Sequence, residues 1–274
     1  MIKYFHPVYV VPVLAAFIVG IVGNRISEYL AGPWEIVLLI VAVIFVVASV
    51  WMKAREETIT VSMSPPITLR LPVDKERYAK KGIIVFVSLY KPMGDKSTAK
   101  NLGVNGRCQA AKQNNYKLLD LPNSNLGSAI TSIITHRSRL EHCWLIATET
   151  DKPEASSITY LPVLETYLEE VEHMACEFHQ TTIPFGDDAQ VVSKSRDLVK
   201  DIFRQSEEFN LAEQDIVADI TGGTRSVILG MILACQDEKR DVQLVGTTYD
   251  GLGNPDYTHP FPMLFSFETK VEPR

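Results

Sequence analysis

The chain has 274 residues, of which 46% are hydrophobic, and a formal net charge of −6. This length suits one globular domain with an additional segment. No stretch is basic enough to predict a long DNA- or RNA-binding surface, although a small anionic ligand, which needs only a local basic site, is compatible with this composition.

Two apolar segments near the N-terminus have the length of membrane-spanning helices. The first, His6–Gly23, contains no charged residue, and the second, Trp34–Met52, contains only Glu35 at its beginning. A helix needs roughly 20 apolar residues to cross a bilayer, within a range near 17–25. The first segment lacks an A-x-A cleavage site, and a second span follows it closely, which favours a retained helix over a signal peptide. We therefore predict a transmembrane hairpin over residues 1–52, with spans at about 6–23 and 34–52.

The charges beside these segments predict their orientation. Lys3 precedes the first span and Lys53 and Arg55 follow the second, whereas the connector between the spans holds only Arg25. The positive-inside rule therefore predicts that both termini and the C-terminal domain lie in the cytoplasm. On these residues alone an anchor is favoured over a pore, because the second span has almost no polar side chain that would line a water-filled channel.

Beyond the hairpin, residues 53–81 are predicted to be a connector with one short extended segment, and the rest to be a domain over residues 82–274. In that domain, apolar strands alternate with amphipathic helices. We expect strands at 82–90, 143–150, 176–184, 215–223, 240–250 and 262–271, and helices at 127–140, 156–174, 187–209 and 224–236. Ser156 or Ser157 would cap the second helix. This alternation predicts an α/β fold with a mostly parallel sheet covered by helices on both faces.

A long polar insertion, residues 92–125, follows the first expected strand. It is rich in Lys, Asn and Gly. Loops of this length without secondary structure are uncommon in compact domains and are usually functional or disordered. We interpret this insertion as a lid over a site or as a mobile loop.

The cysteines and histidines show no metal-binding spacing. No two of the four cysteines, Cys108, Cys143, Cys176 and Cys235, form a CxxC pair, so they are interpreted as buried thiols in a reducing compartment. The histidines include two pairs with six-residue gaps, His136 with His142 and His173 with His179. Because two side chains share a helix face only at a spacing of three or four, we expect structural or surface histidines, no metal site and no cofactor.

Three of the expected strands end in polar residues. In a parallel sheet these ends meet at one edge, where ligands of α/β proteins bind. The candidate ligand-binding residues are therefore Ser88, Leu89, Tyr90, Lys91, Thr148, Glu149, Thr150, Thr221, Gly222, Gly223, Thr224 and Arg225.

The most informative of these ends is the sequence DIVADITGGTRSVILG, residues 215–230. Its glycine pair permits unusual backbone conformations and the close approach of a ligand. Thr224 can cap the following helix, whose free N–H groups suit a phosphate, and Arg225 can grip phosphate with two hydrogen bonds. A tight turn without a ligand is an equal alternative on these residues alone. GxGxxG, GxxxxGK[ST] and GxSxG are absent from the sequence, which argues against dinucleotide, P-loop and serine-hydrolase sites.

The segment DITGGTRSVILGMILA resembles the signature of the CRISPR-associated Rossmann-fold (CARF) family, in which an apolar strand, T-G-G-T-K and an apolar helix follow one another. The strand GIIVFVSLYKP resembles the other ligand-contacting region of that family. Element order extends the resemblance over residues 80–250. Arg225 stands where the family usually has Lys, which keeps the charge but not its shape. The resemblance implies a Rossmann-like domain that senses cyclic oligoadenylate, the messenger of type III CRISPR antiviral defence.

The resemblance also implies a mode of action. CARF domains typically form homodimers in which two equal sites hold one ring. Thr221–Arg225 would contact ribose and phosphate, Ser88–Lys91 would form the other wall, and Thr148–Thr150 would lie nearby. With a membrane hairpin, the implied function is an oligomeric effector of the bacterial inner membrane. It would form a pore or depolarise the membrane when the ring, expected to be cyclic tetra-adenylate, binds.

Two alternatives stay open at this point. Some CARF domains cut their own ligand slowly when a 2′-hydroxyl attacks the adjacent phosphate, and Thr224 and Arg225 would then stabilise the transition state. No His or Glu is an evident base, so a binding protein is expected rather than an enzyme. The other alternative is a membrane-anchored α/β domain that binds a different nucleotide or a protein.

Overall fold

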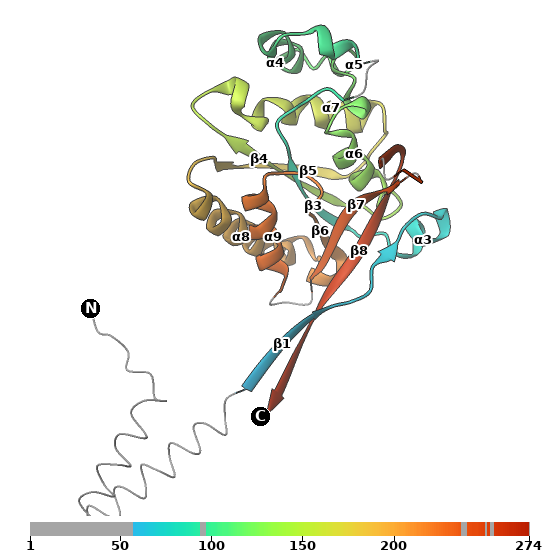
Figure 1. Ribbon diagram of the computed structural model, residues 1–274, viewed down its shortest axis with the longest axis vertical. Helices are drawn as coiled ribbons and strands as arrows, with labels where there is room; N and C mark the ends of the chain where they lie inside the picture. The colour runs from blue at the N-terminus through green and yellow to red at the C-terminus, as the bar shows by residue number, and fades with distance from the viewer. Residues whose placement is uncertain (1–56, 94–96, 237–239, 250, 253–254, 274) are drawn as a thin grey trace, which may run out of the picture. The chain divides into compact units, whose positions relative to one another are not determined.

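The computed structural model describes residues 57–93, 97–236, 240–249, 251–252 and 255–273 (Figure 1). The two predicted membrane spans lie outside these residues. In the described part of the chain, no helix has both the length and the apolar character that crossing a bilayer requires. The contacts divide the chain into two units, and the candidate site described below belongs to the unit Val61–Thr269.

Apolar runs of strand length form the sheet. Its strands are β1 (Glu57–Met63), β2 (Ile67–Thr68), β3 (Gly82–Val87), β4 (His142–Glu149), β5 (Glu177–Pro184), β6 (Ile216–Asp219), β7 (Asp241–Tyr249) and β8 (Pro255–Pro273). They lie in the order β1-β8-β7-β6-β3-β4-β5, with β2 beside β8. The strands from β7 to β5 are parallel, whereas β8 runs antiparallel to β7 and β2. The prediction of a mostly parallel sheet is confirmed.

The direction of strand addition reverses beside β3. The chain adds β4 and then β5 on one side of β3, and it returns to place β6 and β7 on the other side. β3 is therefore paired in parallel with β4, where Gly82 faces His142, and with β6, where Gly82 faces Ile216. In open α/β sheets, the carboxyl ends of the strands at such a reversal form a crevice in which ligands bind.

Helices cover both faces of the sheet (Figure 1). One face carries α4 (Val104–Lys112), α5 (Tyr116–Leu119), α6 (Gly127–Ile134) and α7 (Leu161–Glu170), and the other carries α8 (Asp188–Gln205) and α9 (Arg225–Gln236). Alternate residues of a strand point to opposite faces. Ile83 and Val85 accordingly join the core beneath α6 and α7, while Ile84 and Phe86 join the core beneath α8 and α9.

Two segments differ from their predicted structure. The predicted connector contains β1, β2 and a short helix, α3 (Pro72–Arg77), and its residues 61–81 belong to the same unit as the sheet. The insertion 92–125, expected to be a lid or a mobile loop, forms α4 and α5. These helices pack because small and aliphatic side chains among the polar residues are buried, namely Ala110, Ala111, Leu119 and Leu121.

Candidate ligand-binding site at the carboxyl ends of β3 and β6

The glycine turn after β6 lies directly against the end of β3. The backbone N–H of Gly223 donates a hydrogen bond to Ser88 Oγ at 2.8 Å. A Cβ atom on Gly222 would lie 2.4 Å from the carbonyl oxygen of Phe86, and Gly223 has a φ of +102°. Both positions therefore require glycine, one for space and the other for backbone conformation. The turn brings together the two predicted walls of the site at the point where the strand order reverses.

Helix α9 begins at this turn with groups that suit an anion. Thr224 caps the helix, because Val227 N–H donates to Thr224 Oγ1 at 3.4 Å and Ile228 N–H donates to the Thr224 carbonyl at 3.0 Å. The N–H groups of Arg225 and Ser226 belong to the first turn and have no acceptor within the helix. The Arg225 side chain is exposed. An anion placed here would meet N–H donors, the positive end of the helix dipole and a guanidinium.

A buried carboxylate beneath the sheet edge accepts hydrogen bonds from the first residue of the glycine turn. Asp219 is fully buried. It accepts hydrogen bonds from Thr221 N–H at 2.9 Å, from Thr221 Oγ1 at 3.0 Å and from the Ser132 hydroxyl. Burial raises the pKa of Asp219, against the opposing effect of these donors. Thr221 Oγ1 also accepts from Val245 N–H at 2.7 Å, so this predicted ligand-binding hydroxyl already has a donor and an acceptor within the protein.

The network continues to a buried histidine. The N–H of Lys80 donates to His136 Nδ1 at 3.0 Å, so Nε2 carries the proton and donates to Gln243 Oε1 at 2.7 Å. Gln243 in turn donates to Ser132 Oγ at 2.9 Å and to Asp219 at 3.3 Å. Burial lowers the pKa of His136 to about 4, so the imidazole is neutral. This network connects α6, β6 and β7 beneath the turn, and sequence reasoning did not identify it.

The chain leaving β3 is held by Asn125, which the sequence analysis also missed. Lys91 N–H donates to Asn125 Oδ1 at 2.7 Å, and Asn125 Nδ2 donates to the Leu89 carbonyl at 2.8 Å. The side chains of Leu89 and Lys91 are exposed. Tyr90 is instead buried, with its ring stacked on Tyr160 and its hydroxyl donating to the Leu119 carbonyl. Burial raises the pKa of Tyr90 to about 12. Leu89 and Lys91, but not Tyr90, therefore have exposed side chains beyond β3.

The polar end of β4 is occupied mainly by internal contacts. Thr148 is buried, and its N–H donates to Ser157 Oγ at 2.8 Å. Thr150 N–H donates to Ser156 Oγ at 2.8 Å. These serines were expected to cap a helix; they bind the end of β4 instead, and α7 begins only at Leu161. Of the three predicted residues here, Glu149 has the exposed side chain, and it accepts a hydrogen bond from Thr182 Oγ1 at 3.2 Å.

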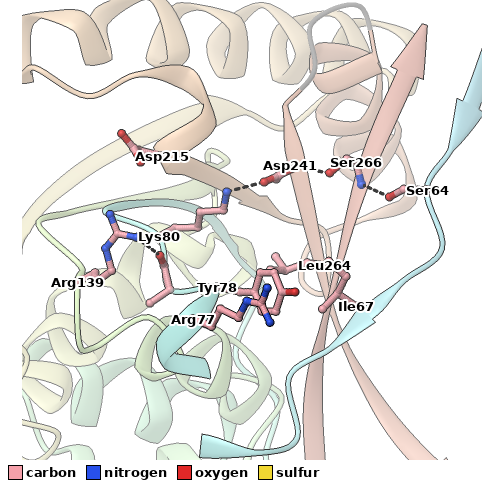
Figure 2. A pocket seen from close by; sticks show the side chains of 11 residues that line it. Ser64, Ile67, Arg77, Tyr78, Lys80, Arg139, Asp215, Asp241, Leu264 and Ser266 are labelled. Atoms are coloured by element: carbon pink, nitrogen blue, oxygen red, sulfur yellow. Dashed lines mark hydrogen bonds and ion pairs between the residues drawn. The ribbon is translucent and has the colours of Figure 1, made fainter. Parts of the chain in front are cut away.

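A cavity of about 220 Å³ lies at the opposite edge of the sheet (Figure 2). Its lining includes residues at the amino ends of β3, β6 and β7, and Figure 2 shows Lys80 pointing to Asp241. Lys80 Nζ also donates to the Gln214 carbonyl at 2.7 Å, and Arg139 donates to the Ala79 carbonyl at 3.3 Å. Two of the three cations that line the cavity, Lys80 and Arg139, are thus engaged within the protein, and Asp215 adds a negative charge to the lining, so the cavity is a weaker anion site than the glycine turn.

Comparisons with known protein-family models and with curated protein sequences find no match to this chain.

Proposed function

We propose that the protein is a CARF-like membrane effector of type III CRISPR antiviral defence, which binds cyclic oligoadenylate and responds through its N-terminal hairpin. One observation carries this proposal. The T-G-G-T-R turn packs on the end of β3 through Ser88 and opens helix α9 at the reversal of strand order. A glycine turn, a helix N-terminus and a reversal point are each common, but their coincidence is typical of a nucleotide-binding edge.

The chemistry of this edge suits a ring of adenylates. The first N–H groups of α9 and the exposed Arg225 and Lys91 would bind phosphates. Leu89 offers an exposed apolar surface for a base, with 42% of the residue accessible to solvent. Glu149 would accept hydrogen bonds from ribose hydroxyls or an adenine amino group. A cyclic ligand with two-fold symmetry would join two such edges, so the active form would be a homodimer of this domain.

The hairpin over residues 1–52 would provide the output. A ligand shifts a conformational equilibrium only when it binds one state more tightly than the other. We propose that ring binding between two domains favours a packing of the membrane helices that opens a path for ions across the bacterial inner membrane. Cyclic tetra-adenylate is the expected ring.

A reconstitution experiment tests this function. Full-length protein in lipid vesicles that hold a potassium gradient should dissipate the gradient after cyclic tetra-adenylate is added, and it should stay closed without the ring. The Arg225→Glu variant should remain closed at the same ring concentration, because the reversed charge repels phosphate. Vesicles that stay closed although the ring is bound would contradict the proposed output and leave the hairpin as an anchor.

A further inference from the structure

Two histidines and a glutamate gather at the beginning of β4 and β5. In the register of these parallel strands, His142 lies opposite Glu177 and Trp144 lies opposite His179. Residues two apart in a strand point to the same face, so His142 and His179 share the face on which Trp144 joins the core beneath α8. His142 and His179 are far apart in the sequence, but the pairing of β4 with β5 brings their rings together, with centroids 5.3 Å apart.

The three side chains converge with the geometry of a metal site. His142 Nδ1 and His179 Nε2 share a hydrogen bond of 3.0 Å, which a bound ion would replace with release of its proton. Glu177 Oε2 lies 3.7 Å from His142 Nδ1. One ligand atom from each residue can be chosen so that all three lie within 4.8 Å of one another. Two ligands of a tetrahedral Zn²⁺ lie roughly 3.3 Å apart when the bonds are about 2.0–2.1 Å. The carboxylate is too far from the imidazole for a normal hydrogen bond, but a bound ion would bridge them.

Aromatic packing fixes the two imidazoles. The ring of Trp144 stacks on His142 and on His179, with centroids 5.8 and 5.2 Å away. Phe209, which follows α8 in the short turn Ser206–Phe209, contacts the two imidazoles from 4.6 and 5.1 Å. The histidine side chains are 13% and 21% exposed, and that of Glu177 is 63% exposed. The two imidazoles are thus held by aromatic rings, and the carboxylate beside them is exposed to solvent.

We propose that His142, Glu177 and His179 bind a divalent transition-metal ion, with Zn²⁺ as the preferred metal. Two neutral imidazoles and one carboxylate are a ligand set that suits zinc, and they leave a fourth position for water. The ion would join the edge strand β5 to β4. The site lies at the amino end of β4, roughly 20 Å along the strand from Thr148, so metal binding and messenger binding should be separable.

Metal titration of the full-length protein, purified without a histidine tag, tests this proposal. Zn²⁺ should bind in a ratio of one ion per chain in calorimetry, and Co²⁺ should give the visible absorption of a tetrahedral complex. His142→Phe and His179→Phe keep a ring against Trp144 but remove the ligand nitrogen, and Glu177→Gln removes the anionic ligand. Loss of a residue that only hydrogen-bonds to a metal ligand weakens metal affinity by about 10- to 100-fold. Because each of these variants removes a ligand itself, each should weaken Zn²⁺ binding by more than that.

The matched control is His173→Asn, which removes an exposed histidine outside the cluster. Its φ of +51° is one that Asn tolerates, so this variant should bind Zn²⁺ as the wild type does. Circular dichroism establishes that each variant folds, and Glu177→Gln, at an exposed side chain, keeps the test valid if either Phe variant does not fold. Wild-type protein that binds no Zn²⁺, or cluster variants that bind it as tightly as His173→Asn, would overturn the proposal.

Discussion

Gly222→Ala should reduce the affinity for cyclic oligoadenylate by roughly 100-fold, equivalent to about 2.7 kcal/mol. The added Cβ would lie 2.4 Å from the backbone carbonyl oxygen of Phe86, and a backbone atom of the central strand cannot move aside as a flexible side chain would. The turn must therefore leave β3, which removes the contact between Gly223 N–H and Ser88 and misaligns the start of α9. Crowding of this kind costs about 1–3 kcal/mol of stability.

Gly223→Ala should have a similar effect for a different reason. Its φ of +102° is a conformation that residues with a Cβ rarely adopt, and the new atom would lie 3.0 Å from the Phe86 ring. Gly186→Ala is the matched control, because its Cβ would meet no atom within 4 Å. Calorimetric titration with the ring would measure the affinity of each of the three variants, and denaturant unfolding would measure the stability of each. If Gly222→Ala binds the ring as tightly as Gly186→Ala, the glycine turn does not contact the ligand.

Asp219→Ala should lower the free energy of unfolding by about 3 kcal/mol or more. Asp219 is the buried acceptor for donors from Thr221, Ser132 and Gln243. Each buried donor left without a partner costs about 1–3 kcal/mol, and the side-chain cavity adds to that cost. Denaturant unfolding would measure the difference. Messenger binding should weaken as well, because Thr221 would no longer be held in place at the start of the turn.

Two further variants separate the loss of the hydrogen-bond acceptors from the general effect of removing an acidic side chain. Asp219→Asn keeps one acceptor oxygen but adds an N–H₂ group among existing donors, so its loss of stability should lie between those of the wild type and Asp219→Ala. Asp197→Ala removes an exposed acid that pairs with the neighbouring Arg196 on α8, and it should change stability by less than about 1 kcal/mol. An Asp219→Ala variant as stable as Asp197→Ala would contradict the structural role assigned to the buried network.

The positions of the buried strands follow from patterns within the sequence, whereas their order in the sheet does not. The run GIIVFV is apolar throughout and is buried at every position as β3, which is the pattern of a strand covered on both faces. The insertion 92–125 could not be predicted in the same way, since its buried residues are few and separated by polar ones. Its helices depend on packing against Tyr160 and Tyr167 of the later segment 157–170, which local periodicity does not reveal.

The location of the candidate site could be predicted from the sequence, but the bonding of its side chains could not. Polar strand ends predicted the edge at which the residues lie, because strands of a parallel sheet end together. Local sequence could not show which hydroxyl groups are already bonded within the protein. Thr148 is hydrogen-bonded to Ser157, and the Thr221 hydroxyl is hydrogen-bonded to Asp219 and to the Val245 N–H. The Tyr90 ring stacks on Tyr160. Each partner, except Asp219, is distant enough in sequence that only the tertiary structure reveals the contact.

Calorimetric titration of the full-length protein with cyclic tri-, tetra- and hexa-adenylate tests the central claim most directly, with linear tetra-adenylate as the matched control. We expect one ring to bind two chains, cyclic tetra-adenylate to bind most tightly, and the linear compound to bind much more weakly. Chromatography of the ligand afterwards would show whether the ring has been cut. If none of the rings binds, or if Arg225→Glu and Gly222→Ala bind them as the wild type does, the glycine turn between β6 and α9 is not a messenger site.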